Sequence, residues 1–537
     1  MISAAPGRLA AAFYFALFPL VGIIVAYIGF CDPDTCWHLA LGRWMFEHHQ
    51  LPLNDPFSSN INDFVKAASG QPIMQHEWLS DLIFYTLYKT GGPIALLNVA
   101  ALSCTLALLV LPANRLVKAG LPRLTAIVLA GCVILASLFR LWVRPEIFSF
   151  LYFAILLAHL EPDRKVGDKK QLSTLLAIFI LMAVWANCHA LFILGLGYLF
   201  LNAILRLLIF ALSKIAPALI DDNQSPWSAL LSALFGLVGT LCTPWTIDLF
   251  GYLAKILTSA AAFGNKENST LFASSLTHLT VAPLIVAFAA VALIFASSLK
   301  RQRPKTFDLI LPFGLYGAAL AMVVLFRRFT PFGLLILLEA LIVWPGPVQS
   351  GGGPSASVFA PILIRSQDYL GRLKLPGSRA ALVGLSLTAI FVTLTAAILV
   401  EPEIPSRSRF FTPACQAIEF IANRHFDGRL LNDSRLGSML TFCLADPPDI
   451  FIDGRFDSYS RPLIADYERM RGARGSYLDL LSAYKITWIF FPPTTPLVEA
   501  LGGNPDWIEV YRDSAAVILI HRRKDNSPGA APSEQLR

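Results

Sequence analysis

QLSTLLAIFILMAVWANCHALFILGLGYLFLNAILRLLIFALS, residues 171–213, decides the fold class of this chain. It consists of two apolar runs, 171–190 and 191–213, which meet at the short polar segment WANCHA. The hydrocarbon core of a bilayer is about 30 Å thick, and about 20 helical residues cross it. Each run therefore predicts one transmembrane helix, and the pair predicts a hairpin.

The composition extends this prediction to the whole chain. Of the 537 residues, 55% are hydrophobic and 15% are charged, and the mean hydropathy is +0.59. Soluble globular proteins have about a quarter of their residues charged. The net charge of +7 does not indicate a nucleic-acid partner, because the basic residues form short clusters between apolar runs. We therefore expect an α-helical polytopic protein of the cell (inner) membrane, in contact with membrane lipid and with no nucleic-acid partner.

Runs of membrane length recur along the chain and predict about eleven transmembrane helices. No small-x-small cleavage site follows the first run, so it predicts an uncleaved helix rather than a secretory signal. The runs lie near residues 9–30, 91–112, 122–142, 146–160, 171–190, 191–213, 228–247, 280–299, 307–326, 330–345 and 381–400.

Lys and Arg occupy every second loop between these runs. Loops rich in Lys and Arg stay in the cytoplasm. This pattern predicts a cytoplasmic N-terminus, a first extracytoplasmic loop at 31–90, and an extracytoplasmic region from Glu401 onward. The basic residues are Arg115, Lys118, Arg123, Arg164, Lys165, Lys169, Lys170, Lys214, Lys300, Arg301, Arg303, Lys305, Arg365, Arg372, Lys374 and Arg379.

The pattern of the chain changes after residue 400. We expect a transmembrane domain over 1–400, an extracytoplasmic α/β domain over 401–523, and a disordered tail over 524–537. Periodicity in the second region predicts helices at 412–424, 462–470 and 477–484. Strands are predicted for RLLND (429–433), DIFIDGR (449–455), ITWIFF (486–491) and AAVILIHRR (515–523).

The cysteines form no metal-ligand cluster in the sequence. The pairs Cys31 and Cys36, and Cys415 and Cys443, lie in regions that we expect outside the membrane, where disulfides can form. Free buried thiols are the alternative for both pairs.

With this topology, most of the unusual polar residues fall on the outer side. Charges near membrane depth are costly and tend to mark function. In the first loop they are Asp32, Asp34, His38, Asp55, His76 and Glu77; in the turns between spans they are Arg140, Arg144, Glu146, Asn187, His189, Arg327 and Arg328.

Several of these residues have a structural alternative. Asp34 precedes an amphipathic helical pattern and could be its N-cap. Asp55 precedes a proline and fits a turn. His189 could be a hydrogen-bonded structural histidine. Glu339, inside the tenth run, is an acid for which the sequence suggests no partner.

Four segments of the chain resemble segments of a known group of membrane proteins. DPDTCWHLALGRWMFEHHQLPLNDPFS…QHEWLSDLIFY, RPEIFSFLYF, WANCHALFILGLG and RRFTPFGLL resemble, in the same order, segments of bacterial multi-pass membrane proteins of the GT-C glycosyltransferase type, many of them uncharacterised. The tail LLNDSRLGSML…DIFIDGRFDSY…DWIEVYRDSAAVILIHR is similar to the C-terminal extracytoplasmic domain of that group. The resemblance covers most of the chain, and the combination is more specific than any single motif.

The resemblance implies an inverting transfer of a sugar from a polyprenyl-phosphate donor to an extracytoplasmic glycan, lipid or protein acceptor. The carboxylate in the first outer loop is the usual general base, which maps to Asp32 or Asp34, and we favour Asp34. Asp32 and Asp34 could also hold a divalent cation, Mg²⁺ or Mn²⁺, although some enzymes of this type need none. The donor phosphate would meet Arg140, Arg144, Arg327 and Arg328, and the acceptor or phosphate would be oriented by His38, Glu77, Asn187 and His189.

Two alternatives come from other functional classes. A transporter or flippase of lipid-linked precursors needs polar residues on both sides of the membrane, whereas here they gather on one. A non-catalytic envelope scaffold would use the outer domain as a binding module. In that domain FIDGRFDSY (451–459) supplies Asp453, Arg455 and Asp457, which we expect to pair within the fold.

Overall fold

The computed structural model describes residues 34–68, 74–159, 169–219, 226–254, 278–302, 305–344 and 414–522. The predicted spans near 9–30 and 381–400, the tail 524–537, and Cys31 and Asp32 lie outside the described residues. The chain divides into two compact units. One comprises Met1–Gly29 and Leu96–Leu394; the other comprises Phe30–Ala95 and Thr395–Arg537.

The first unit is helical. Helix α4 (Trp78–Thr105) begins in the other unit, is interrupted at Gly91 and Gly92, and continues through a π-helical turn, Leu106–Val110, into α5. Only glycine adopts the backbone of Gly92 (φ +63°, ψ −161°) readily. The remaining elements are α5 (Leu111–Lys118), α6 (Arg123–Ala136), η2 (Leu138–Arg140), α7 (Glu146–His159), α8 (Lys169–Cys188), α9 (Phe192–Ile215), η3 (Pro217–Leu219), α10 (Pro226–Thr240), α12 (His278–Gln302), η6 (Thr306–Leu309), α13 (Ile310–Leu325), η7 (Arg327–Phe329) and α14 (Thr330–Ile342).

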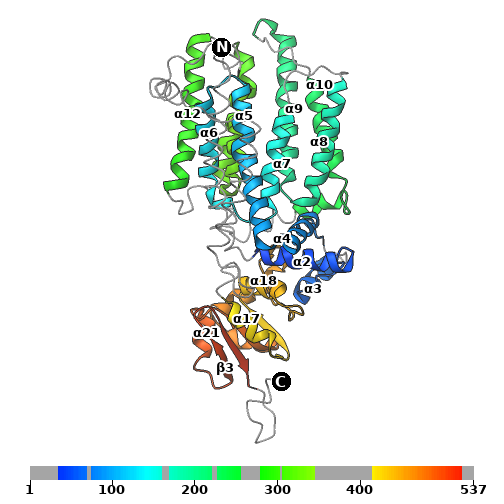
Figure 1. The fold of residues 1–537 in the computed structure, drawn as a ribbon, viewed down its shortest axis with the longest axis vertical. Helices are drawn as coiled ribbons and strands as arrows, with labels where there is room; N and C mark the ends of the chain where they lie inside the picture. The colour runs from blue at the N-terminus through cyan, green and yellow to red at the C-terminus, as the bar shows by residue number, and fades with distance from the viewer. Residues whose placement is uncertain are drawn as a thin grey trace, which may run out of the picture. The chain divides into compact units, whose positions relative to one another are not determined.

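Small residues allow these helices to approach closely. Helices α8, α9 and α10 lie side by side (Figure 1). At Gly239 of α10, an added Cβ would lie 3.3 Å from the backbone nitrogen of Ala183 on α8 and would overlap the carbonyl oxygen of Phe179. Without a hydrophobic driving force between helices in lipid, such backbone proximity is what makes van der Waals packing effective.

Five helices in the described part of the chain are long and apolar enough to cross a membrane, by length and composition. The hairpin predicted from 171–213 is confirmed as two helices, and the chain is a mostly helical protein with the character of a multi-pass membrane protein. The count of about eleven spans is not confirmed. The five are Trp78–Lys118, Lys170–Cys188, Phe192–Ile215, Val281–Leu299 and Thr306–Leu325; shorter apolar helices cover Thr125–Ala136, Glu146–His159 and Pro226–Thr240.

Glu339 has a partner that the sequence did not suggest. Arg115 of α5 donates from Nη2 to Oε1 of Glu339 on α14 at 3.0 Å, and a second contact joins Nη1 to Oε2. Arg115, which we placed in a basic loop, is only 15% exposed. The pair joins α5 to α14 inside the helical unit.

We therefore expect Arg115→Met to destabilise the helical unit by about 1–3 kcal/mol, because it leaves a buried acceptor without its donor. The measurement is the urea midpoint of the full-length protein in detergent. The double variant Arg115→Met/Glu339→Gln should recover part of the loss. Equal stability of the single variant and the wild type would contradict this role.

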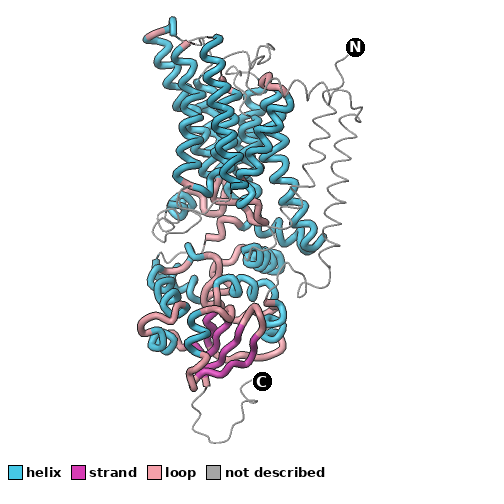
Figure 2. The backbone as a smooth tube through the Cα atoms, turned by 90° about the vertical axis from the view of Figure 1, so that its left-hand side faces the viewer, coloured by secondary structure: helices cyan, strands magenta, loops and turns pink. Residues whose placement is uncertain are grey.

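The second unit contains a four-stranded sheet with the order β1-β2-β4-β3 (Figure 2). β1 and β2 are parallel, and β4 runs antiparallel to both β2 and β3. The strands and helices of this region are α17 (Cys415–Ala422), β1 (Arg429–Asn432), α18 (Ser434–Cys443), η8 (Phe456–Ser458), α19 (Arg461–Arg471), α20 (Tyr477–Ala483), β2 (Ile486–Phe491), α21 (Pro496–Leu501), β3 (Trp507–Arg512) and β4 (Val517–His521).

The first-loop segment belongs to the same unit. It supplies α2 (Asp34–His48), α3 (Ser59–Ala68) and the start of α4. Ile61 of α3 is fully buried in one apolar cluster. The cluster also contains Leu431 of β1, Ile489 of β2, and Phe451 from the segment before η8. Arg43 of α2 donates to the carbonyl oxygens of Thr441, Phe442 and Leu444 at 2.9–3.0 Å. The cation thereby satisfies carbonyl groups at the C-terminal end of α18, where the helix dipole favours it.

The strand predicted for 449–455 is wrong. Its backbone groups bond to the first loop and to the side chain of Asn432 rather than to the backbone of a neighbouring strand. The Ile450 N–H donates to the Phe57 carbonyl at 2.8 Å, and the Ser58 hydroxyl donates to the Ile450 carbonyl at 2.8 Å. Asn60 donates to the Phe451 carbonyl at 2.8 Å, and the Asn432 amide donates to the Ile452 carbonyl at 2.6 Å. The apolar residues that suggested a strand are instead buried between the first loop and β1.

Cys415 and Cys443 are free thiols. Burial raises the pKa of Cys443 to about 12, and the neighbouring Cys415 makes a smaller contribution in the same direction. The thiolate is the form that is oxidised or alkylated, so this thiol is unreactive in the folded protein.

We expect Cys443 to alkylate with a maleimide at pH 8 at least about 100-fold more slowly in the folded protein than in urea, because so little thiolate is present. Peptide mass spectrometry of the full-length protein gives the rate at each cysteine. The exposed thiol of Cys242 serves as an internal control. Comparable folded and unfolded rates at Cys443 would contradict its burial.

Candidate functional site

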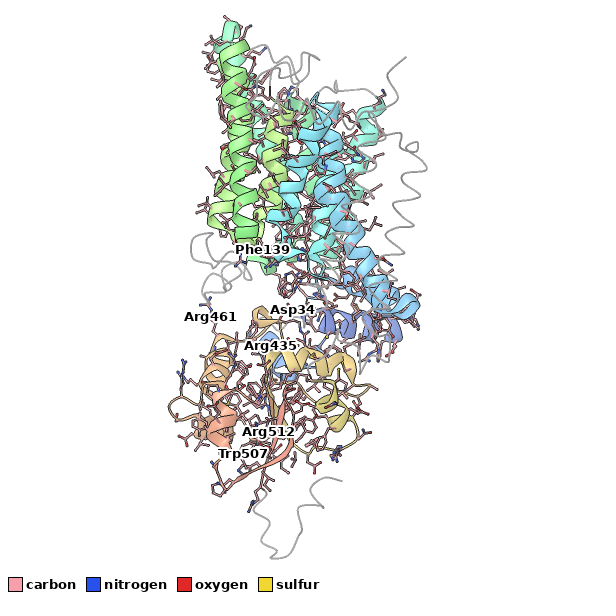
Figure 3. The ribbon with its side chains drawn as sticks, turned by 60° about the vertical axis from the view of Figure 1, so that its left-hand side comes forward. Asp34, Phe139, Arg435, Arg461, Trp507 and Arg512 are labelled. Carbon is pink, nitrogen blue, oxygen red and sulfur yellow. The ribbon has the colours of Figure 1, made fainter. Side chains whose placement is uncertain are left out.

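Asp34 is the first residue of α2 and is half-buried (Figure 3). Its negative charge in the first turn is favourable at a helix N-terminus. Gly454, from the FIDGR segment, lies against it: a Cβ built on Gly454 would overlap Oδ1 of Asp34 and lie 3.1 Å from its Cγ and 3.5 Å from Trp37 Nε1. The carboxylate predicted as the general base is therefore held between the first loop and the C-terminal region of the same unit.

A buried imidazole–carboxylate pair lies one turn farther along α2. His38 Nδ1 is 2.6 Å from Oδ1 of Asp81, and both side chains are almost completely buried. The other ring nitrogen of His38, Nε2, is 3.9 Å from Glu77 Oε2. Gly42 makes this approach possible, because a Cβ there would overlap the carbonyl oxygen of Asp81 on α4. Asp81 fixes the orientation of the His38 ring, as a carboxylate does for a catalytic or metal-bound imidazole.

Arg455 forms the third group of this unit. Its Nη2 is 2.6 Å from Oδ2 of Asp453 and 3.2 Å from Oδ1 of Asp55, and all three side chains are buried. Burial acts to lower the pKa of Arg455, but the carboxylates of Asp453 and then Asp55 outweigh it and hold the pKa well above its usual value. The guanidinium also lies 5.6 Å from the ring centre of Trp37. The predicted pairing is confirmed for Asp453 and Arg455, and the side chain of Asp457 lies outside those described. The participation of Asp55 from the first loop was not predicted.

Asp55 also has the turn role expected of it. Its Oδ1 accepts hydrogen bonds from the backbone N–H groups of Phe57 and Ser58 at 3.0 and 2.8 Å. The same carboxylate thus shapes the loop before α3 and neutralises Arg455.

The helical unit contains the predicted arginines. Arg140 of η2 forms a buried ion pair with Glu146 of α7, and Arg328 of η7 lies 3.7 Å from the second oxygen of that carboxylate. Arg327 packs over the ring of Phe139 (4.5 Å to its centre), and Arg144 lies 5.3 Å from the ring centre of Trp142. Two arginines therefore converge on one carboxylate, while two lie against aromatic faces.

Asn187 lies in the last turn of α8, and His189 directly follows this helix. The Asn187 amide donates to the carbonyl oxygens of Ala183 and Cys242 at 2.8 Å, and joins α8 to the segment after α10. His189 Nδ1 is 2.8 Å from the Ser149 hydroxyl, which also accepts a hydrogen bond from Trp185 Nε1 at 2.8 Å. The buried hydrogen bond of His189 fits the structural alternative for this residue.

The predicted site residues thus fall into two groups, one in each unit. Asp34, His38 and Glu77 lie with the C-terminal region, and the arginines, Asn187 and His189 lie in the helical unit. That both groups act on one substrate stays a prediction. Asp32 lies outside the described residues. No group of three or more His, Cys, Asp or Glu that could hold a metal ion occurs among the residues described. A divalent cation at Asp32 and Asp34 stays a prediction.

Sequence reasoning missed Asp81 and Gly454 as site residues. Asp81 is the last residue of HEWLSD (76–81). A helix that begins at residue 78 places it about one turn beyond Glu77. Gly454 lies in FIDGR, where a strand was expected. A glycine inside an apparent strand often marks a close approach of another group, and this was the available signal.

Neither a protein-family model nor a curated protein matches this sequence. The resemblance to GT-C glycosyltransferases therefore stays a prediction that is based on the motifs.

Proposed function

We propose that this protein is an inverting membrane glycosyltransferase that moves a sugar from a polyprenyl-phosphate donor to an acceptor on the outer side of the membrane. The observation that carries the proposal is the Asp34 carboxylate, half-buried at the start of α2 and held against Gly454. Apolar helices give the chain access to a lipid-linked donor. The topology that places Asp34 outside is the one predicted from the basic loops.

The chemistry assigns each group a task. An acceptor hydroxyl has a high pKa, so a carboxylate must take its proton as it attacks. In the proposed step the acceptor oxygen bonds to the anomeric carbon, its proton passes to Asp34, and the bond from that carbon to the phosphate oxygen breaks. The electron pair leaves with the polyprenyl phosphate, and attack from the opposite face inverts the anomeric centre.

The leaving phosphate gains negative charge, which fixed cations stabilise. Arg140 and Arg328 both lie against the carboxylate of Glu146, so two guanidinium groups gather at this position in the helical unit. Guanidinium groups bind phosphate oxygens in a bidentate manner. We assign Arg140 and Arg328 to the donor phosphate, with Arg327 and Arg144 beside them on aromatic faces.

The test compares lipid-linked and envelope glycans, by mass spectrometry, in cells with and without the gene. The expected result is a glycan that loses one sugar without the gene, with accumulation of the corresponding polyprenyl-phosphate sugar. Purified full-length protein in proteoliposomes should then form the covalent product from that donor. Identical glycans in both cells, or movement of the precursor across proteoliposomes without covalent product, would overturn the proposal; the second result would indicate a flippase.

A further inference from the structure

We infer that Gly454, in the C-terminal region, is a positioning residue for the Asp34 carboxylate. This inference rests on the proposed function and deepens it. It makes the C-terminal region part of the catalytic site rather than an accessory module.

The backbone at Gly454 does not itself require glycine. The glycines with positive φ in the described chain are Gly92, Gly120, Gly428 and Gly475, and Gly454 is not among them. An alanine could therefore adopt the local conformation without strain. What an alanine would lack is space, because its methyl group would take the position of Oδ1 of Asp34. The absence of a side chain at 454 thus leaves the space that this carboxylate occupies.

The segment around Gly454 is fixed from several sides. The Gly454 N–H donates to the Ser438 hydroxyl on α18 at 3.2 Å, and the Asp453 N–H donates to the Tyr459 hydroxyl at 3.1 Å. Arg455 is held by two buried carboxylates. Because this backbone is anchored on several sides, and the atom that the methyl group meets is the terminal oxygen of a side chain, an added methyl group would displace the carboxylate rather than the segment.

The consequence is a residue whose substitution should separate catalysis from folding. A displacement of about 1 Å in a reacting group can cost about 100-fold in rate. Truncation of the C-terminal region could not show this, because it would also remove the hydrogen-bond partners of Ser58 and Asn60 and the counter-ion of Asp55. A single methyl group at 454 leaves all of these contacts in place.

The experiment uses the full-length protein with Gly454→Ala, and Gly503→Ala as the matched control. No atom lies within 4 Å of a Cβ built on Gly503, which belongs to the same unit. We expect Gly454→Ala to lower kcat about 100-fold, with the KM for the donor and the thermal midpoint close to those of Gly503→Ala. In an Asp34→Asn background, Gly454→Ala should cause no further loss, because it acts through Asp34.

A second readout does not depend on transfer. Carbodiimide-driven modification of carboxyl groups, followed by peptide mass spectrometry, should show faster labelling of Asp34 in Gly454→Ala and unchanged labelling of the exposed Asp63. Wild-type labelling of Asp34, full activity of Gly454→Ala, or an additive loss in the Asp34→Asn background would each overturn the inference. If Asp34→Asn itself stays active, the base assignment fails; if Asp34→Asn is inactive and Gly454→Ala is not, only the positioning role fails.

Discussion

We expect Asp34→Asn to lower the proposed sugar transfer by about 100- to 10,000-fold, the usual contribution of a general base. Asparagine has the size of aspartate and fits beside Gly454, but its amide cannot accept the acceptor proton at neutral pH. The measurement is the initial rate of transfer by full-length protein in proteoliposomes with the identified polyprenyl-phosphate donor. Binding of the donor should be little changed, because we assign the phosphate to the arginines of the helical unit.

The matched control for this variant is Asp63→Asn, an exposed acid of α3 in the same unit. It should transfer at the wild-type rate, and both variants should reach the membrane at equal levels. Asp32→Asn and the double variant complete the set. Near-normal transfer by all three variants at positions 32 and 34 would remove both proposed carboxylates, and with them the mechanism.

We expect Arg455→Met to destabilise the unit formed by the first loop and the C-terminal region by about 3–5 kcal/mol. Methionine fills much of the volume of the arginine stem, but it leaves the carboxylates of Asp55 and Asp453 buried without their counter-charge. Taking one partner from a buried ion pair costs far more than the pair contributes as a whole, because the remaining charge stays desolvated. Pulse proteolysis of full-length protein in urea measures the loss through cleavage sites in residues 414–522.

Two further variants show that the cause is the unpaired charge. Arg469→Met removes an exposed arginine of α19 that forms a surface pair with Asp466, and should change stability by less than about 1 kcal/mol. The triple variant Asp55→Asn/Asp453→Asn/Arg455→Met removes all three charges and should recover much of the loss. If Arg455→Met is no less stable than Arg469→Met, the buried cluster does not hold the unit together.

The local pattern predicted many of the individual elements, although not β3, α18 or α21. Long apolar runs predict helices because backbone groups in lipid must be satisfied within the helix itself, so the 171–213 hairpin, α12 and α13 follow from composition. In the polar region, β1, β2, α19, α20 and β4 follow from periodicity. These signals depend on neighbours within a few residues of each other, which a single sequence contains.

The FIDGR segment shows where local pattern failed. The apolar run 450–452 at its start favours a strand, yet the carbonyl groups of this run accept hydrogen bonds from Ser58, Asn60 and Asn432. Two of these residues lie about 390 positions away in the chain. No periodicity encodes such a pairing, because the pattern records burial and not the identity of the partner.

The candidate site divides in the same way. The sequence by itself determined which chemical groups are present: a first-loop carboxylate at Asp34, arginines at the turns between spans, and the helices that carry them. Only the tertiary structure decided what surrounds these groups. Gly454 lies against Asp34, and Asp81 is hydrogen-bonded to His38. Arg455 is paired with both Asp55 and Asp453. Helix formation depends on short-range backbone hydrogen bonds, whereas the placement of a buried charge depends on which distant group can satisfy it.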